Sequence, residues 1–162
     1  MAPDYNFLII GCGNEQFGDA AVGPRVAATV ANWNLPTVRS FAVTQLTPEL
    51  TAELAKTNYV IFVDACSRTR VRTVQIDPVV VCDQQSPSKT FVAHSYAPGA
   101  LLSLTQRLYR RHPQSWMLQI PIESCDEGSI LSSKAYQGCA HALRSIEQFF
   151  LTYQQPFEMK SA

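Results

Sequence analysis

Short apolar runs along this chain alternate with longer segments in which apolar residues recur every three or four positions. Short apolar runs are typical of strands, whereas a spacing of three or four residues is typical of a helix with one buried face. The run at 59–63 (YVIFV) is apolar throughout, which favours a parallel strand covered on both faces. We predict five strands, at 7–12, 37–43, 59–63, 71–81 and 116–122. Pro121, in the last of them, indicates a strand end or an edge.

Four other segments have the spacing of amphipathic helices. The second helix is expected to start at Thr47-Pro48-Glu49, where a capping hydroxyl precedes a proline and an acid. The third follows Pro98-Gly99, and Ser132 is placed to cap the fourth. The expected buried stripes are Val22, Val26 and Val30; Leu46, Leu50 and Leu54; Leu101, Leu104, Thr105 and Leu108; and Cys139, Leu143, Ile146 and Phe150. From Gln154 onward no pattern is present, and we expect that tail to fray.

The order of these elements predicts an α/β protein, a three-layer α/β/α sandwich around a mostly parallel sheet. A chain of 162 residues with 46% hydrophobic residues is large enough for one core, so we expect a single domain over 1–162. In such folds ligands bind at the carboxyl ends of the strands. Functional residues are therefore expected just after each strand.

Composition excludes several classes of protein. Thirteen basic and thirteen acidic residues give a net charge of zero, which argues against a nucleic-acid or membrane-surface partner. The five cysteines are odd in number and form no CxxC pair, which favours reduced thiols. The first apolar run is too short to span a bilayer and has no basic segment before it. We therefore predict a cytoplasmic protein.

The loop after the first strand carries a G-x-G pair at Gly11 and Gly13. Two glycines allow a tight turn and a close approach of backbone. A dinucleotide fingerprint needs a third glycine at position 16, which is Gln16, so nucleotide binding is disfavoured. No G-x-S-x-G motif is present for a serine hydrolase.

Acids and one histidine follow the predicted strands. Asp19 has the position of an N-cap, and Asp64, after the third strand, can bind loop amides or perform chemistry. His94 lies in a loop before the third helix, and Glu123 follows the fifth strand as a solvated acid or a further site residue. Together, two carboxylates and an imidazole resemble an open oxygen and nitrogen site for nickel, zinc or iron.

These features resemble the nickel–iron hydrogenase maturation endopeptidases. The resemblance rests on the opening strand and its motif, on an aspartate ending the third strand (VIFVDA), and on the later loop histidine. It extends from about residue 7 to 150. The motif residues are Gly11, Gly13, Asn14, Asp19 and Gly23. The segment 45–50 (QLTPEL) is similar to the branch that serves bidirectional, NAD-linked hydrogenases.

The resemblance implies a phosphorylase/hydrolase-like fold with a mixed five-stranded sheet, whose fourth strand is antiparallel. It also implies an aspartyl-type endopeptidase that cuts the C-terminal extension from a hydrogenase large-subunit precursor after nickel insertion. Nickel would arrive with the precursor and be recognised by Asp64 and His94. The family's remaining ligand position corresponds to Ala20, which has no donor, so Asp19, or Glu15 as a substitute, would supply the third ligand.

Two alternatives stay open at this point. Ala20 is compatible with a catalytically weakened relative that binds a precursor or assembly factor without cutting it. Peptidyl-tRNA hydrolases also begin with a strand and G-x-G-N, although the zero net charge disfavours an RNA substrate.

Overall fold

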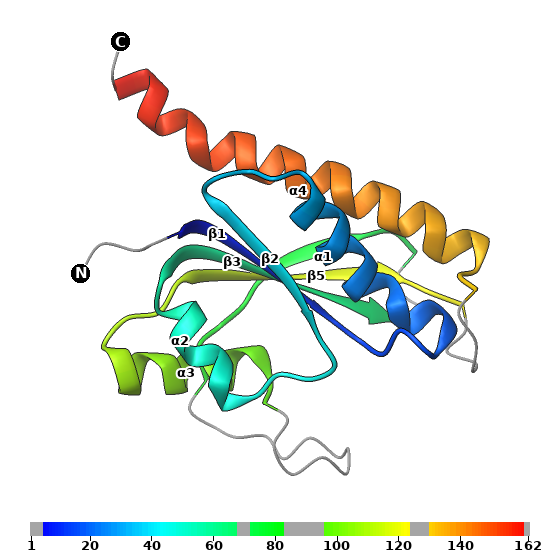
Figure 1. Cartoon of the computed structure of the whole chain (residues 1–162), viewed down its shortest axis with the longest axis horizontal. Coiled ribbons are helices and arrows are strands. Elements are labelled where there is room, and N and C mark those ends of the chain that lie inside the picture. The colour runs from blue at the N-terminus through cyan, green and yellow to red at the C-terminus, as the bar shows by residue number, and fades with distance from the viewer. Residues whose placement is uncertain (1–4, 68–71, 83–95, 124–129, 161–162) are drawn as a thin grey trace.

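The computed structural model describes residues 5–67, 72–82, 96–123 and 130–160, and it places five strands in one sheet (Figure 1). The strands are β1 Tyr5–Cys12, β2 Val38–Val43, β3 Thr57–Cys66, β4 Gln75–Pro78 and β5 Gln114–Pro121. Their order across the sheet is β2-β1-β3-β5-β4. Every pairing is parallel except that of β4 with β5. The predicted mixed, mostly parallel sheet is confirmed.

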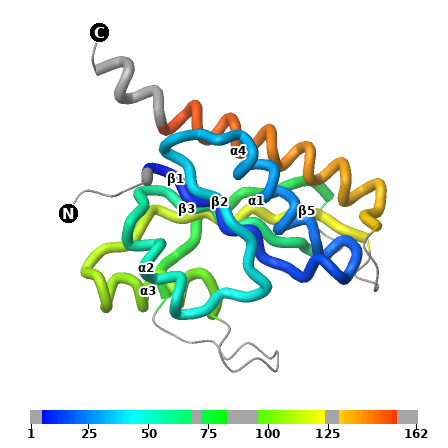
Figure 2. The backbone as a smooth tube through the Cα atoms, in the orientation of Figure 1, coloured from blue at the N-terminus to red at the C-terminus, as the bar shows by residue number. Residues whose placement is uncertain are grey.

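Helices cover both faces of this sheet. The helical segments are η1 Gly18–Ala21, α1 Val22–Asn32, η2 Pro48–Leu50, α2 Thr51–Leu54, α3 Pro98–Tyr109 and α4 Ser133–Lys160. α1 and α4 lie on one face, and α2 and α3 lie on the other (Figures 1 and 2). The three-layer prediction is therefore confirmed. Among the described residues, no helix combines the length and the apolar character needed to cross a membrane.

Alternation along the strands builds two separate cores. Phe7 and Ile9 of β1 pack in the core on the α1 and α4 side, whereas Leu8 and Ile10 pack in the core on the α2 and α3 side. This period of two follows from the pleat of a strand. Each of these fully buried side chains contributes roughly 1.5 to 3 kcal/mol through burial. The parallel strands are therefore held from both sides, which fixes where their carboxyl ends lie.

Two glycines allow α1 to lie directly on the sheet. A Cβ on Gly11 would stand 2.1 Å from the carbonyl oxygen of Gly23, and a Cβ on Gly23 would stand 2.3 Å from that of Cys12. Real Cβ atoms do not approach backbone so closely, so only glycine permits this crossing. The motif glycines thus place η1 and the start of α1 at the carboxyl end of β1.

Several local expectations need correction. α3 buries Leu101, Leu102 and Thr105, but Leu108 is 59% exposed because the last turn of the helix extends beyond the core. Thr47 makes no side-chain cap, and the segment after it forms only the short η2 and α2. The predicted fourth strand, 71–81, shortens to β4.

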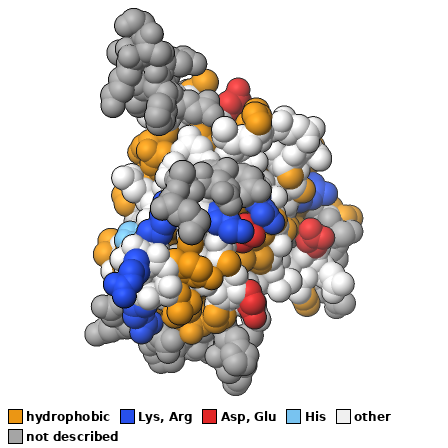
Figure 3. All heavy atoms as spheres, turned by 60° about the vertical axis from the view of Figure 1, so that its left-hand side comes forward, with side chains coloured by type: hydrophobic (Ala, Val, Ile, Leu, Met, Phe, Trp, Pro, Cys, Tyr) orange, Lys and Arg blue, Asp and Glu red, His pale blue; other side chains and the backbone are white. Residues whose placement is uncertain are grey.

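The tail differs from the expectation of fraying, because the backbone of α4 remains helical to Lys160. The view in Figure 3 brings forward the left-hand side of Figure 1. Among the described residues on that face, basic side chains gather at the left beside apolar ones, and acidic side chains are scattered.

Candidate functional site

The carboxyl ends of the parallel strands meet at one edge of the sheet, as predicted. Gly11 of β1 pairs with Val63 of β3, and Cys66 of β3 pairs with Pro121 of β5. The glycine loop and η1 follow β1 at this edge, and Glu123 follows β5. Backbone contact continues past the strands, since the Ile122 amide donates to the Cys66 carbonyl at 3.1 Å.

Asp64 is one of the last residues of β3 and does not lie after the strand, because β3 continues to Cys66. Its side chain is half-buried, and its Oδ1 accepts a hydrogen bond from the Ala65 amide at 2.8 Å. Within the described chain its Oδ2 has no hydrogen-bond partner. Burial raises the pKa of this carboxyl to about 6, against the smaller opposing effect of the Ala65 amide. Asp64 is therefore a carboxylate that is costly to ionise and has one oxygen available to a ligand.

Cys12 is the neighbour of Asp64 on β1. Burial, together with the smaller effect of the negative charge of Asp64, raises the pKa of its thiol to about 12. Only a thiolate is a strong nucleophile or metal ligand. Cys12 therefore stays protonated at neutral pH.

Asp19 has a different environment. Its side chain is 1% exposed, and both carboxylate oxygens accept hydrogen bonds. Oδ2 accepts from the Glu123 amide at 3.0 Å and from the Ser132 hydroxyl at 2.6 Å, and Oδ1 accepts from the Ser132 amide at 2.7 Å. Asp19 makes no capping bond for η1, whose N-cap is Phe17, so the N-cap interpretation is wrong. Its described bonds instead hold the connection between β5 and α4.

The start of α4 is part of the same network. The Ser132 hydroxyl accepts from the Ala135 amide at 3.1 Å, which confirms the predicted cap, and it also donates to Asp19. Glu123 has an exposed side chain, and its backbone amide is bound to Asp19. The hydrogen bonds of Ser132 to Asp19 could not be predicted from the sequence, because no local pattern indicates a contact across 113 positions.

The predicted ligand set is brought together only in part. Asp19 and Asp64 lie at the same edge, Glu15 is exposed in the glycine loop, and His94 lies outside the described residues. Within residues 5–67, 72–82, 96–123 and 130–160, no three His, Cys, Asp or Glu side chains are grouped as a metal site. Of the described acids, Asp64 best fits a metal presented by another molecule, because an oxygen of its carboxylate is not already bound.

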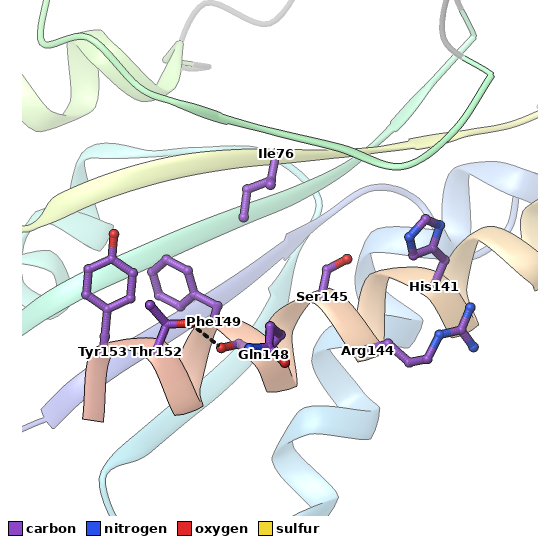
Figure 4. A pocket seen from close by; sticks show the side chains of 8 residues that line it. All are labelled: Ile76, His141, Arg144, Ser145, Gln148, Phe149, Thr152 and Tyr153. Atoms are coloured by element: carbon purple, nitrogen blue, oxygen red, sulfur yellow. Dashed lines mark hydrogen bonds between the residues drawn. The ribbon is translucent and has the colours of Figure 1, made fainter. Parts of the chain in front are cut away.

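A groove of about 440 Å³ lies between α4 and β4, away from this site (Figure 4). Ile76 of β4 points toward the helix, and His141, Arg144, Phe149 and Tyr153 line the helical side. The groove is on the α4 side of the sheet. Asp64 alternates with Val63, which faces α1 and α4, and therefore points to the other side.

Comparison with known proteins yields structural likeness only. No family model matches the chain, and no curated protein matches it by sequence. The hydrogenase maturating endopeptidase HybD of E. coli is 19% identical, with a TM-score of 0.67 over 87% of this chain and 89% of that chain. The [NiFe] hydrogenase maturation protease HybD of Thermococcus kodakarensis is 18% identical, with a TM-score of 0.64 over 89% of this chain and 98% of that chain.

A second protease of Thermococcus kodakarensis, HycI, is 18% identical, with a TM-score of 0.66 over 88% of this chain and 90% of that chain. The likeness covers nearly the whole of each protein. It shows that the chain has the fold of these maturation proteases. At such identities the likeness shows the fold alone, and the activity depends on the residues of the site.

Proposed function

We propose that this protein is a hydrogenase maturation endopeptidase, which removes the C-terminal extension from a nickel–iron hydrogenase large-subunit precursor after nickel insertion. The observation that carries the proposal is Asp64, a half-buried carboxylate with one unbound oxygen at the carboxyl end of a central strand. The fold, shared with HybD of E. coli over 87% of this chain, supports it. So do the glycine motif and the close crossing of α1 that this motif permits.

In this proposal nickel is part of the substrate and is presented by the precursor. Asp64 and His94 recognise the ion, and recognition places the scissile peptide bond at the edge of the sheet. The ion then polarises the carbonyl, activates a water molecule, or serves only as a mark of a loaded precursor. By similarity of segment 45–50, the precursor is that of a bidirectional, NAD-linked hydrogenase, and the reaction is cytoplasmic.

Asp19 is assigned a positioning role. A carboxylate that already accepts bonds from Ser132 and Glu123 would lose them on turning toward an ion. Ala20 offers only a methyl group. The third donor is therefore Glu15 or a group of the precursor itself, and Asp19 fixes the segment beside them.

The direct test mixes purified protein with nickel-loaded precursor and measures the mass of the large subunit. The unaltered protein is expected to remove the extension. Asp64→Ala is expected to reduce the rate by at least about a hundredfold, as for the loss of one group that acts on the developing charge. Asp77→Ala, an exposed acid on β4, is the matched control. An unchanged precursor mass, with a related protease active in parallel, contradicts the proposal.

The second candidate is a binding protein that holds the precursor without cutting it, and Ala20 is the observation that favours it. Ala20→Glu and Ala20→Asp restore an acid at this position. If the unaltered protein binds the precursor without cutting it and these variants cut it, the second candidate is established. If the unaltered protein cuts the precursor and Asp64→Ala does not, the second candidate is eliminated.

A further inference from the structure

A row of polar side chains crosses the sheet beside Asp64. In the register of β3 with β5, Asp64 pairs with Gln119, and in the register of β5 with β4, Gln119 pairs with Gln75. Neighbouring strands lie about 4.8 Å apart. Gln119 is thus the lateral neighbour of Asp64, and Gln75 is one strand further out.

Alternation puts these side chains on the same face. Phe62, two residues before Asp64, belongs to the core under α2 and α3, and Met117, two residues before Gln119, packs against the same core. Leu118 lies in the opposite core. Because side chains two apart on a strand share a face, Gln119 points to the side of the sheet that carries Asp64.

Nothing in the described protein uses the Gln119 amide. The side chain is half-buried on a central strand, yet its oxygen and nitrogen make no hydrogen bond within the described chain. A polar group withdrawn from water without a partner costs free energy. Its two polar atoms are not sealed from solvent, since neither is among the buried atoms that lack a partner. The Gln119 amide is therefore accessible, and a ligand can bind it without breaking a hydrogen bond of the described chain.

An amide side chain offers one acceptor and a donor side by side, which matches a main-chain peptide group. We propose that Gln119 binds a peptide group of the precursor next to the scissile bond and thereby sets that bond beside Asp64. The Gln119 Nε2 donates to the precursor carbonyl oxygen, and its Oε1 accepts from a precursor N–H. This inference rests on the proposed function and adds a substrate-binding residue to it.

The same row gives the bound segment a direction. Gln75 is exposed on the outermost strand, so the precursor passes from Asp64 across β5 toward β4. Main-chain contacts of this kind accept many side chains. Gln119 would therefore contribute to binding whatever the sequence around the cleavage site.

The test compares Gln119→Met with Gln114→Met in cleavage of nickel-loaded precursor. Methionine keeps the volume of glutamine and removes its hydrogen bonds, and Gln114 is an exposed glutamine at the other end of the same strand. Gln119→Met is expected to lower kcat/KM about ten- to hundredfold, mostly through KM, as for a contact made equally before and during reaction. Gln114→Met is expected to leave both constants unchanged.

A second measurement separates binding from folding and from catalysis. In an Asp64→Asn background, which prevents cleavage, adding Gln119→Met is expected to weaken precursor binding about tenfold. Melting temperatures of all variants check that they are folded, and Gln119→Asn, which keeps a shorter amide, is expected to recover part of the affinity. A merely structural role would not give recovery by the shorter amide together with an unchanged melting temperature.

The outcomes distinguish the two proposals. If the unaltered protein cleaves the precursor and Gln119→Met behaves as Gln114→Met does, the role of Gln119 is overturned and the proposed function stands. If the unaltered protein binds without cleaving, the endopeptidase proposal fails and the binding measurement still decides the role of Gln119. If it neither cleaves nor binds, both proposals are overturned.

Discussion

Two aspartates at one edge of the sheet differ in almost every physical respect. Asp19 is sealed from solvent, and both of its oxygens are bound by groups that belong to the connection between β5 and α4. Asp64 is half-buried, receives one described hydrogen bond, and has its pKa raised to about 6 by burial. The first holds segments together, and the second is kept available at a cost in stability.

An aspartate can therefore lie close to a site without taking part in its chemistry. From sequence both aspartates are acids after strands, and either qualifies as a ligand. Hydrogen-bond partners distinguish them, because a satisfied carboxylate stabilises the fold and an unsatisfied one destabilises it. Substitutions at the two positions are therefore expected to change stability in opposite directions.

The largest effect is expected for Asp19→Ala. The variant leaves the amides of Glu123 and Ser132 without their acceptor inside the protein, which should lower the free energy of unfolding by about 3 to 5 kcal/mol. Urea denaturation measures this as a lower midpoint. Asp77→Ala, at an exposed acid, should stay within about 0.5 kcal/mol of the unaltered protein. Equal midpoints for the two variants would show that the hydrogen bonds of Asp19 do not stabilise the fold.

Asp64→Asn is expected to act in the other direction. With a pKa of about 6 in the folded chain and an ordinary value of 3.8, the carboxyl holds its proton only in the folded state between these pH values. Stability contributed by this group is therefore fully present below pH 3.8 and is lost as pH rises through 6. At pH 7 the asparagine variant should be more stable by up to about 3 kcal/mol.

The sign can be checked by unfolding both proteins in urea from pH 3.5 to pH 8. The gain from Asp64→Asn should be near zero at the acid end and grow between about pH 4 and pH 6. Asp77→Asn, at an exposed acid on β4, is the matched control. If Asp64→Asn instead lowers the stability at pH 7, the ionised Asp64 carboxylate is well solvated or paired.

A smaller effect is expected for Ser132→Ala. This change removes one donor to Asp19 and the acceptor for the Ala135 amide, which together should cost about 1 to 2 kcal/mol. Ser133→Ala, at the exposed next position, is the matched control. In a double-mutant cycle Ser132→Ala and Asp19→Ala should be less than additive, because they share a hydrogen bond. Strict additivity would show that the two residues act independently.

The smallest effect is expected for the rate at which Cys12 is alkylated. Cys12, with a pKa of about 12, should resist iodoacetamide at pH 8, whereas the exposed Cys82 should react readily. Peptide mapping by mass spectrometry measures both in one sample. Asp64→Asn should raise the rate at Cys12 slightly, since it removes a neighbouring negative charge, and leave Cys82 unchanged. Rapid labelling of Cys12 in the unaltered protein would place that thiol in a polar or open environment.

Local patterns predicted the sheet and the position of Asp64 at the end of one of its central strands. The run at 59–63 predicted a buried central strand, and the acid after it led directly to Asp64. The predicted buried stripe of α3 is correct at Leu101 and Thr105 and wrong at Leu108, since the pattern cannot show that the last turn of the helix extends beyond the core. The partners of Asp19 were also beyond reach, because Glu123 and Ser132 are more than a hundred positions away and each has an ordinary local interpretation.

The bonds between Asp19 and Ser132 close a loop of 113 positions, which has a consequence for the timing of biogenesis. A ribosome releases the segment around Asp19 long before Ser132 exists, so in a nascent chain this carboxylate stays hydrated. The Asp19 carboxylate can form its hydrogen bonds within the protein only after the segment around Ser132 has been synthesised. A partly synthesised chain that stops before Ser132 therefore lacks the hydrogen bonds that hold this edge of the sheet together.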